Sequence, residues 1–406
     1  MKKRTLLIIL LALVCTGAWG KGIKNDKPTN KGLRGFYRVG AWLDRYLQKD
    51  IDTSYIALPE HSWRLAFTTA MVGINSTVTN QTNFGTFAMQ NKSIPSVDLG
   101  FHAGYRSLGF GYSWDALNSY SRRLNFSLGS KFIGLDFSLQ KTNNIDTRIL
   151  MYGQTIFDDI RRQVTITNAN LNIWYALNAA HYSHNAAIKQ SYLQKRTAGS
   201  LLVHISYMSS EISISDSLRI SGAERPLIPA LMSNMTGFQT RQFAAGIGYG
   251  INYTPNHGKV ILHASAAAML VAYTVNHISY FIADSITAEL PSGEPMYRLQ
   301  PAIPVHVTGN VRAAVSWEIN EWVHLSACAT GDHIRFQSAP TAHGNVILLS
   351  NWNWKAQIVV GVRLGAGRER VRRALGDELD KPIDVWTKKN SRLPDWLTGY
   401  FWSPKN

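Results

Sequence analysis

The feature that most constrains this chain is a two-residue alternation of apolar and polar side chains that persists over long stretches. In residues 242–253, one set of alternate positions is apolar or aromatic throughout: Phe243, Ala245, Ile247, Tyr249, Ile251 and Tyr253. The same period holds in residues 168–175, 310–320 and 354–364. Side chains of a β-strand point alternately to its two faces, so this period predicts strands. Runs of about ten residues exceed the usual strand of a soluble sheet and match the length that crosses a bilayer at a tilt.

The connections between these stretches alternate in length. Pro255-Asn256-His257-Gly258 and Asn320-Glu321 each join two long strands tightly, whereas roughly residues 216–238, 276–304 and 338–352 form long connections. This order is typical of a barrel with short periplasmic turns and longer outer loops. We therefore expect an all-β fold, an antiparallel up-and-down transmembrane β-barrel of about 12 strands, with a range of about 10 to 14. The most weakly patterned candidate strands lie between Gly73 and Gln90 and after Asp146.

Aromatic residues are placed as a bilayer interface would require. Trp317 and Trp322 bracket a predicted turn, and Trp352 and Trp354 begin the last predicted strand. Amphipathic rings favour the depth of the lipid headgroups. The alternative on fold is a secreted, soluble β-sandwich that binds glycans, with these rings in its core. That alternative would have shorter strands and a less polar inner face.

The N-terminus predicts export. Lys2, Lys3 and Arg4 precede an apolar run from Leu6 to Val14, and Ala18-Trp19-Gly20 supplies a small-residue cleavage site, so residues 1–20 are expected to be a signal peptide. No later stretch is long and apolar enough for a membrane-spanning helix. Only two cysteines exist, one of them within residues 1–20, so the mature chain has no internal disulfide. Together with the barrel pattern, these features predict an outer-membrane protein.

Three further segments complete the expected organisation. Residues 21–55 form an N-terminal periplasmic segment with a short amphipathic helix at Phe36–Leu47. Residues 56–365 form the β-barrel. Residues 366–406 form a charged and aromatic C-terminal tail in the periplasm, with a plug inside the barrel as the alternative.

The formal net charge is +16, which in an exported protein argues for anionic lipids or acidic ligands and against nucleic acid. Turning the polar faces inward predicts a basic interior, with eight candidate lumen-facing charges: Arg64, Arg106, Arg123, Arg312, Glu318, His324, Lys355 and Arg363. Such charges usually brace a barrel, and an open lumen of this kind would favour anions. His263 with Ser265, and His324 with Ser326, each lie on one face of a strand, yet no specific catalytic motif surrounds them. We assign no catalytic, cofactor-binding or metal-binding residue and expect no cofactor.

Two stretches carry a family resemblance: Asp52-Thr53-Ser54-Tyr55-Ile56, and Tyr182-Ser183-His184-Asn185-Ala186-Ala187-Ile188-Lys189-Gln190 continuing through residues 194–200. They resemble an uncharacterised Bacteroidetes family of exported proteins, domain of unknown function four-four-two-one, over about residues 50–364. The resemblance implies an exported, barrel-like protein. It implies no activity, so no catalytic residue is carried over.

These observations predict an outer-membrane β-barrel that serves as a passive pore or as a structural barrel of the envelope, with a basic, polar lumen. The alternative is a barrel enzyme that modifies lipid or lipopolysaccharide, and the residues favour a protein without enzymatic activity. The expected partners are outer-membrane lipid and lipopolysaccharide, the barrel-assembly machinery and small anionic solutes.

Overall fold

The computed structural model describes residues 51–83, 85–93, 95–117, 121–130, 132–143, 145–157, 164–214, 235–255, 258–280, 296–302, 306–340 and 344–367. Residues 50–364 form one compact unit, and residues 1–49 with 365–406 form another, of which only residues 365–367 are described. The expected signal peptide, the helix at Phe36–Leu47 and the C-terminal tail therefore lie outside the described residues. No helix within the described ranges is long and apolar enough to span a membrane.

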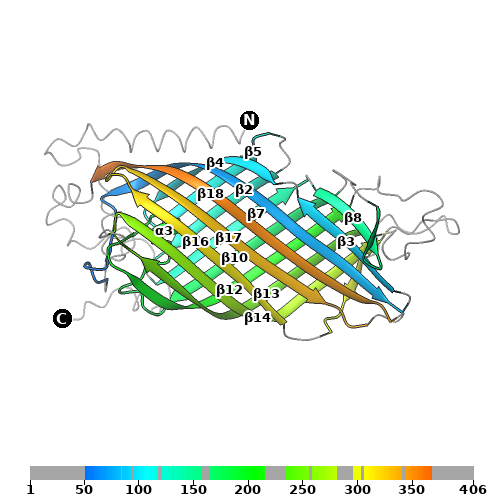
Figure 1. Cartoon of the computed structure of the whole chain (residues 1–406). Coiled ribbons are helices and arrows are strands. Elements are labelled where there is room, and N and C mark those ends of the chain that lie inside the picture. Colours follow the sequence, from blue (N-terminus) through cyan, green and yellow to red (C-terminus); the bar gives the residue numbers. More distant parts are fainter. Residues whose placement is uncertain are drawn as a thin grey trace, which may run out of the picture. The chain divides into compact units, whose positions relative to one another are not determined.

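Twelve antiparallel strands close a ring, which confirms the predicted barrel and its preferred strand number (Figure 1). In ring order they are β2 (His61–Thr82), β4 (Ser96–Tyr105), β5 (Leu108–Asp115), β6 (Ser121–Gly129), β7 (Ile133–Thr142), β10 (Val164–Ala176), β12 (Ala198–Ile214), β13 (Met235–Tyr253), β14 (Val260–Tyr280), β16 (His306–Glu318), β17 (Val323–Gln337) and β18 (Val346–Gly367). β18 pairs with β2 and closes the ring. Closure leaves no free sheet edge around the ring, so the backbone groups of each strand find partners on both sides.

The two ends of the ring differ in their connections. At one end, which we name the turn end, short turns join β4 to β5, β6 to β7 and β16 to β17. At the other, the loop end, β12 ends and β13 begins, β14 ends and β16 begins, and β17 ends and β18 begins, with longer stretches of sequence between them. One long connection lies at the turn end instead. It runs over residues 177–197 and carries α3 (Asn185–Ile188) and β11 (Leu193–Gln194).

Of the weakly patterned stretches, residues 73–82 belong to β2 of the ring, whereas the others form strands outside the ring. β3 (Gly85–Ser93) and β8 (Ile145–Met151) pair with each other. β3 leads into β4 and β8 follows β7, so this pair lies on the loop-end side of the β4–β7 part of the ring. β9 (Gln154–Phe157) pairs with β8, β15 (Met296–Leu299) pairs with β14, and β1 (Ile56–Ala57) pairs with β11.

Several strands reach further toward the loop end than the sequence predicts. β13 begins at Met235, β14 continues to Tyr280, and β18 spans Val346–Gly367 rather than residues 354–364. The reason is a change in the inward face. In the barrel middle the inward residues are mostly polar, but near the loop end they are apolar, as at Phe238, Ile278 and Ile347. The pattern that marks the strands in the barrel middle is therefore lost there.

Candidate lumenal site

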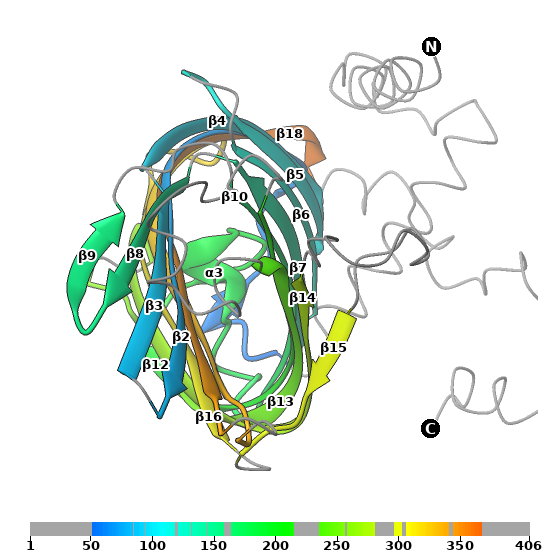
Figure 2. The ribbon, with the colours of Figure 1, turned by 90° about the vertical axis from the view of Figure 1, so that its right-hand side faces the viewer.

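The long connection at the turn end, residues 177–197, folds into the barrel, and we name it the lumenal segment. Figure 2, a view into the barrel, shows α3 inside the ring of strands. Ala186 and Ala187 are fully buried and pack in one apolar cluster with Ile261, Ala314 and Cys328 of three wall strands. Small side chains on both partners let the helix approach the wall closely. Gly129 shows the same tight fit, because a Cβ there would collide with Asn185.

Gln194 holds the two ends of this segment together. Its Nε2 donates to the backbone oxygens of His181 at 2.6 Å and Arg196 at 2.9 Å. Its Oε1 accepts hydrogen bonds from the Ser183 backbone N–H and from Asn252 Nδ2, both at 3.1 Å. The side chain is fully buried, so each of these bonds replaces a contact with water that folding removes.

The segment at residues 52–57 pairs with the lumenal segment and holds it in place. β1 pairs with β11, and the Asp52 carboxylate lies 3.4 Å from His181 Nε2. The side-chain and backbone groups of Ser54 donate to Asp52 and lower the pKa of its carboxyl group. The two stretches that carry the family resemblance are therefore joined to each other in the fold.

Ion pairs and hydrogen bonds join Lys189 and Gln190, in the middle of the lumenal segment, to the barrel wall. Lys189 forms an ion pair with Asp136 of β7, which also pairs with Arg312 of β16 at 3.0 Å. Gln190 donates to Ser316 and accepts from Arg363 at 3.0 Å. Arg363 in turn lies 2.5 Å from Glu318. When two opposite charges are buried as a pair, their attraction and their additional hydrogen bonds offset the free energy of desolvation. Loss of one partner leaves the other charge buried without compensation, which destabilises the fold.

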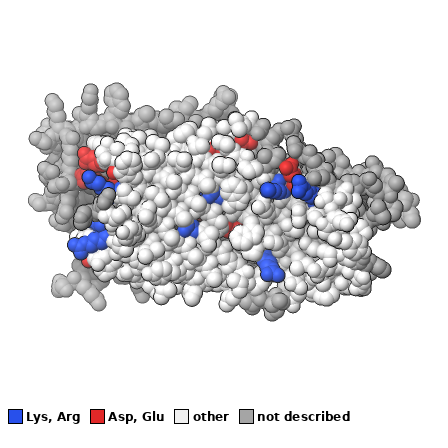
Figure 3. All heavy atoms as spheres, viewed as in Figure 1, with Lys and Arg blue, Asp and Glu red and all other residues white. Residues whose placement is uncertain are grey.

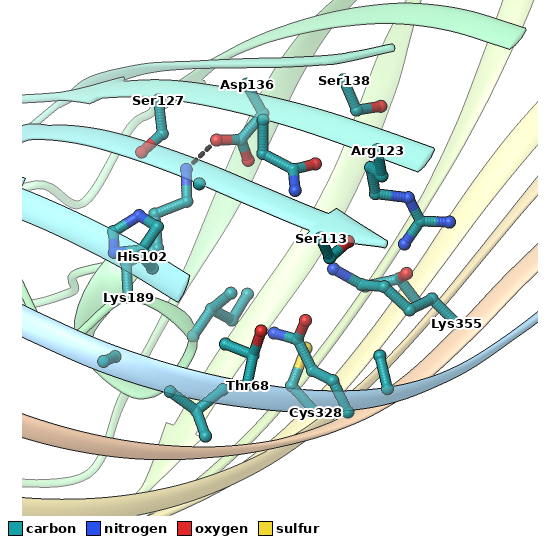
Figure 4. A pocket seen from close by; sticks show the side chains of 18 of the residues that line it. Thr68, His102, Ser113, Arg123, Ser127, Asp136, Ser138, Lys189, Cys328 and Lys355 are labelled. Carbon is teal, nitrogen blue, oxygen red and sulfur yellow. Dashed lines mark hydrogen bonds and ion pairs between the residues drawn. The ribbon is translucent and has the colours of Figure 1, made fainter. Parts of the chain in front are cut away.

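A chamber of about 210 Å³ lies next to residues 188–190 of the lumenal segment. Ile188, Lys189 and Gln190 form part of its lining. Figure 4 shows Arg123, Lys355, Ser113 and Thr68 directed into it from several strands. Its lining includes five basic residues, two carboxylates and two histidines: Arg64, Arg123, Lys189, Arg312, Lys355, Asp136, Asp332, His102 and His324.

Between the chamber and the loop end, side chains from opposite walls meet. Asn168 of β10 donates to Asn353 of β18 at 2.9 Å, and Asn351 of β18 donates to Ser210 of β12 at 2.8 Å. Beyond them, inward residues of ten strands form one apolar cluster, in which the rings of Phe238 and Phe336 are 6.4 Å apart. The interior at these levels is a packed core and not an open channel.

The structure brings the eight predicted lumen-facing charges to three places. Arg64, Arg123, Arg312, His324 and Lys355 line the chamber. Glu318 and Arg363 pair below it, beside the lumenal segment. Arg106 differs, because it lies in the turn between β4 and β5 with a φ of 53°, and its guanidinium stacks over Tyr105. Whether any of them acts on a solute stays a prediction.

One Ser–His arrangement gains an orienting partner. On β14, His263 Nε2 lies 3.2 Å from Ser265 Oγ, and His263 Nδ1 lies 2.8 Å from Asn252 Oδ1 on β13. Asn252 Nδ2 donates to the Ser183 oxygen at 2.8 Å and to Gln194. This fixes Oδ1 as an acceptor, so Nδ1 of His263 carries the proton and Nε2 accepts from Ser265. His324 Nδ1 has no such partner within the described residues. The described residues contain no group of His, Cys, Asp and Glu that could hold a metal ion.

The sequence alone does not place the lumenal segment inside the barrel. Its residues stand out only as the stretch that carries the family resemblance, and the plug that the sequence offers as an alternative is the C-terminal tail. A signal was present. Residues 182–194 are rich in polar side chains, lack the two-residue alternation, and lie in a connection too long for a periplasmic turn.

The family model described as domain of unknown function, DUF4421, matches residues 50–363. The chain belongs to this family. The predicted resemblance is confirmed, and the matched region covers both the ring and the lumenal segment. No curated protein matches the sequence of this family member.

Among solved structures, this DUF4421 member is similar to outer membrane proteins at low identity. The outer membrane protease OmpT from Escherichia coli is 8% identical, with 75% of this chain and 98% of that chain covered and a TM-score of 0.36. The translocator domain of the autotransporter NalP from Neisseria meningitidis is 10% identical, with 82% and 97% covered and a TM-score of 0.29. OprG from Pseudomonas aeruginosa is 8% identical, with 75% and 98% covered and a TM-score of 0.26. The barrel assignment rests on the strand pairing and not on these similarities.

Proposed function

We propose that this protein is an outer-membrane β-barrel that is closed at rest and whose basic chamber takes small anionic solutes. Of the two roles expected from the sequence, a passive pore and a structural barrel of the envelope, the geometry favours a barrel without a standing channel. The observation that carries the proposal is the lumenal segment, which Gln194, Gln190 and Lys189 hold within the ring.

The outer face of the ring supports the membrane location. Tyr207, Phe243 and Tyr273 lie side by side on three neighbouring strands, and all are exposed. Tyr253 lies toward the turn end on the strand of Phe243, about 33 Å away along it, which is about 23 Å along the barrel axis at a tilt of about 45°. This matches an apolar band of about 25 Å.

Charged side chains lie outside this apolar band. On β13, the outward positions between Phe243 and Tyr253 are Ala245, Ile247, Tyr249 and Ile251, and the next outward position beyond Phe243 is Arg241. Figure 3 shows a wall that is mostly free of charged side chains, with Lys, Arg, Asp and Glu gathered toward both ends and few in the middle. Hydrocarbon tolerates such a surface, since each charge at mid-depth would cost about 2–4 kcal/mol.

Conductance of the full protein tests the closed state. Reconstituted into planar bilayers of stated lipid composition, the protein is expected to show no steady current in a salt gradient. Its recovery from cells should be in the outer-membrane fraction, extractable only with detergent. A steady, anion-selective current from the unmodified protein would instead establish a passive pore, and recovery of a soluble monomer would defeat the membrane assignment.

The Asn252–His263–Ser265 arrangement favours a second candidate function, cleavage of acyl esters by a nucleophilic serine. In that reaction Ser265 Oγ attacks the acyl carbonyl, His263 Nε2 takes the serine proton and passes it to the leaving alcohol, and water then releases the acid. Ser265 is partly exposed and faces Arg312 across the strand pair, a cation that can stabilise the developing oxyanion.

Covalent labelling separates this candidate from a purely structural role. A fluorophosphonate probe should label the detergent-solubilised protein, and Ser265→Ala should abolish the label. Ser326→Ala is the matched control, because Ser326 stands two residues from His324 on β17 but Nδ1 of that histidine has no orienting partner among the described residues. Absence of label on the unmodified protein, or its loss in Ser326→Ala alone, would rule out Ser265 as the nucleophile.

A further inference from the structure

We propose that the chamber holds a small oxyanion, of phosphate or carboxylate type, between Arg123 of β6 and Lys355 of β18. The inference deepens the proposed function by naming the ligand class and the residues, and it rests on that function for the assignment of small anionic solutes to the chamber. Figure 4 shows both side chains reaching into the chamber, with Ser113 of β5 between them.

The balance of charge in the chamber calls for an anion. Its lining includes five basic residues and two carboxylates. One of the carboxylates, Asp136, is already shared between Lys189 and Arg312. The other, Asp332, makes no ion pair within 4.0 Å among the described residues. An excess of buried positive charge is unfavourable in a medium of low dielectric constant, and a bound anion offsets it.

Lys355 is the residue that most favours an anion in the chamber. Within the described part of the chain its ammonium has no hydrogen bond and no ion pair, although Lys189 and Arg312, which line the same chamber, both have them. Arg123 donates to Gln140 Oε1, a neutral acceptor, and has no carboxylate within 4.0 Å among the described residues; Asp98 and Asp332 act on it only at longer range. A planar guanidinium and a mobile ammonium facing one space are the donors that bind phosphate and carboxylate groups best.

The rest of this part of the lining supplies neutral donors and room. Thr68, Ser113, Thr330 and Gln357 add hydroxyl and amide groups that can donate to an anion. The volume of about 210 Å³ is many times what a single water requires, so a small solute fits.

Equilibrium dialysis of the detergent-solubilised full protein tests the site. Labelled inorganic phosphate and labelled succinate serve as the two probes, in a constant chloride background. We expect at least one of them to bind saturably, at one site per chain. Arg123→Gln and Lys355→Gln should each weaken binding about tenfold or more, because each removes a charge-assisted hydrogen bond. The probe that binds tells which oxyanion the chamber prefers.

Arg122→Gln is the matched control, since Arg122 is the neighbour of Arg123 on the same strand and faces outward. Its binding should equal that of the unmodified protein. Retention of neither probe by the unmodified protein, or equal weakening by Arg122→Gln, would overturn the inference. Heat-modifiability on gels verifies that every variant is folded. The bilayer measurement is independent. A silent barrel without anion binding defeats this inference and the solute-binding part of the proposed function but leaves the closed state, while a conducting barrel that binds phosphate defeats only the closed state.

Discussion

At the residue scale, one side chain connects the parts of the candidate site. Gln194 donates to the backbone oxygens of His181, Arg196 and Tyr55, and it accepts from Ser183 and Asn252. Gln194→Glu keeps the shape but replaces the donor with a charged acceptor, which faces carbonyl oxygens. Each buried group left unsatisfied costs about 1–3 kcal/mol. We expect the lumenal segment to leave the wall, which uncovers Cys328, and the thiol should then react faster with a small neutral methanethiosulfonate reagent.

Gln300→Glu controls for the added charge, because Gln300 is exposed at the other end of the barrel. Its thiol reactivity should equal that of the unmodified protein. An unchanged rate in a folded Gln194→Glu variant would show that the hydrogen bonds of Gln194 do not hold the segment in place.

At the element scale, the two faces of a strand meet different environments. On β16, Val311 is exposed on the outer wall, while its neighbour Asn310 is buried inside and stands opposite Asp332 of β17. Val311→Lys should therefore weaken folding into lipid vesicles by about 2–4 kcal/mol. Asn310→Lys should be much milder, because the new ammonium gains a carboxylate neighbour. Urea titration in vesicles, read by tryptophan fluorescence, compares the two variants.

Equal damage from both lysines would mean that the outer face is buried in protein and not in lipid. Ala314, an inward-facing residue of the same strand, is a poor site for a lumen-facing control. It packs against Ala186 and Ala187 of α3, so a large side chain there would displace the lumenal segment.

At the scale of the whole molecule, two barriers lie in series within the ring: the lumenal segment at the turn end and the apolar cluster around Phe238 and Phe336 at the loop end. Replacing residues 183–191 with a Gly-Ser linker of equal length should expose Cys328 yet leave the bilayer current near zero. Adding Phe238→Ser and Phe336→Ser should produce a current that leans toward anions, because the chamber between the barriers is basic.

The Phe238→Ser and Phe336→Ser pair without the linker is the necessary comparison and should remain silent. A current from the linker variant alone would show that the loop-end cluster is no barrier. A current from none of the three would leave the chamber without a route through the barrel and favour a purely structural role.

The sequence alone determined the ring. Strand period is a local property, since adjacent side chains of an extended chain must point to opposite faces whatever surrounds them. The alternation at Phe243–Tyr253 therefore predicted both the strand and its outward face, and the short connections predicted antiparallel neighbours. The predicted strand bounds are too short where the inward face changes. Near Ile347 the inward residues become apolar, so the alternation of polar inward and apolar outward side chains ends there although the strand continues.

Only the tertiary structure decided what the barrel contains. Residues 177–197 form a connection with no regular period, and they lie inside the ring because their polar side chains find partners on walls far away in the sequence, such as Asp136 and Ser316. Arg123 and Lys355 share a chamber because closure of the ring brings β18 beside β2 and hence near β6. These contacts depend on closure and register, and neither is encoded in any single stretch of residues.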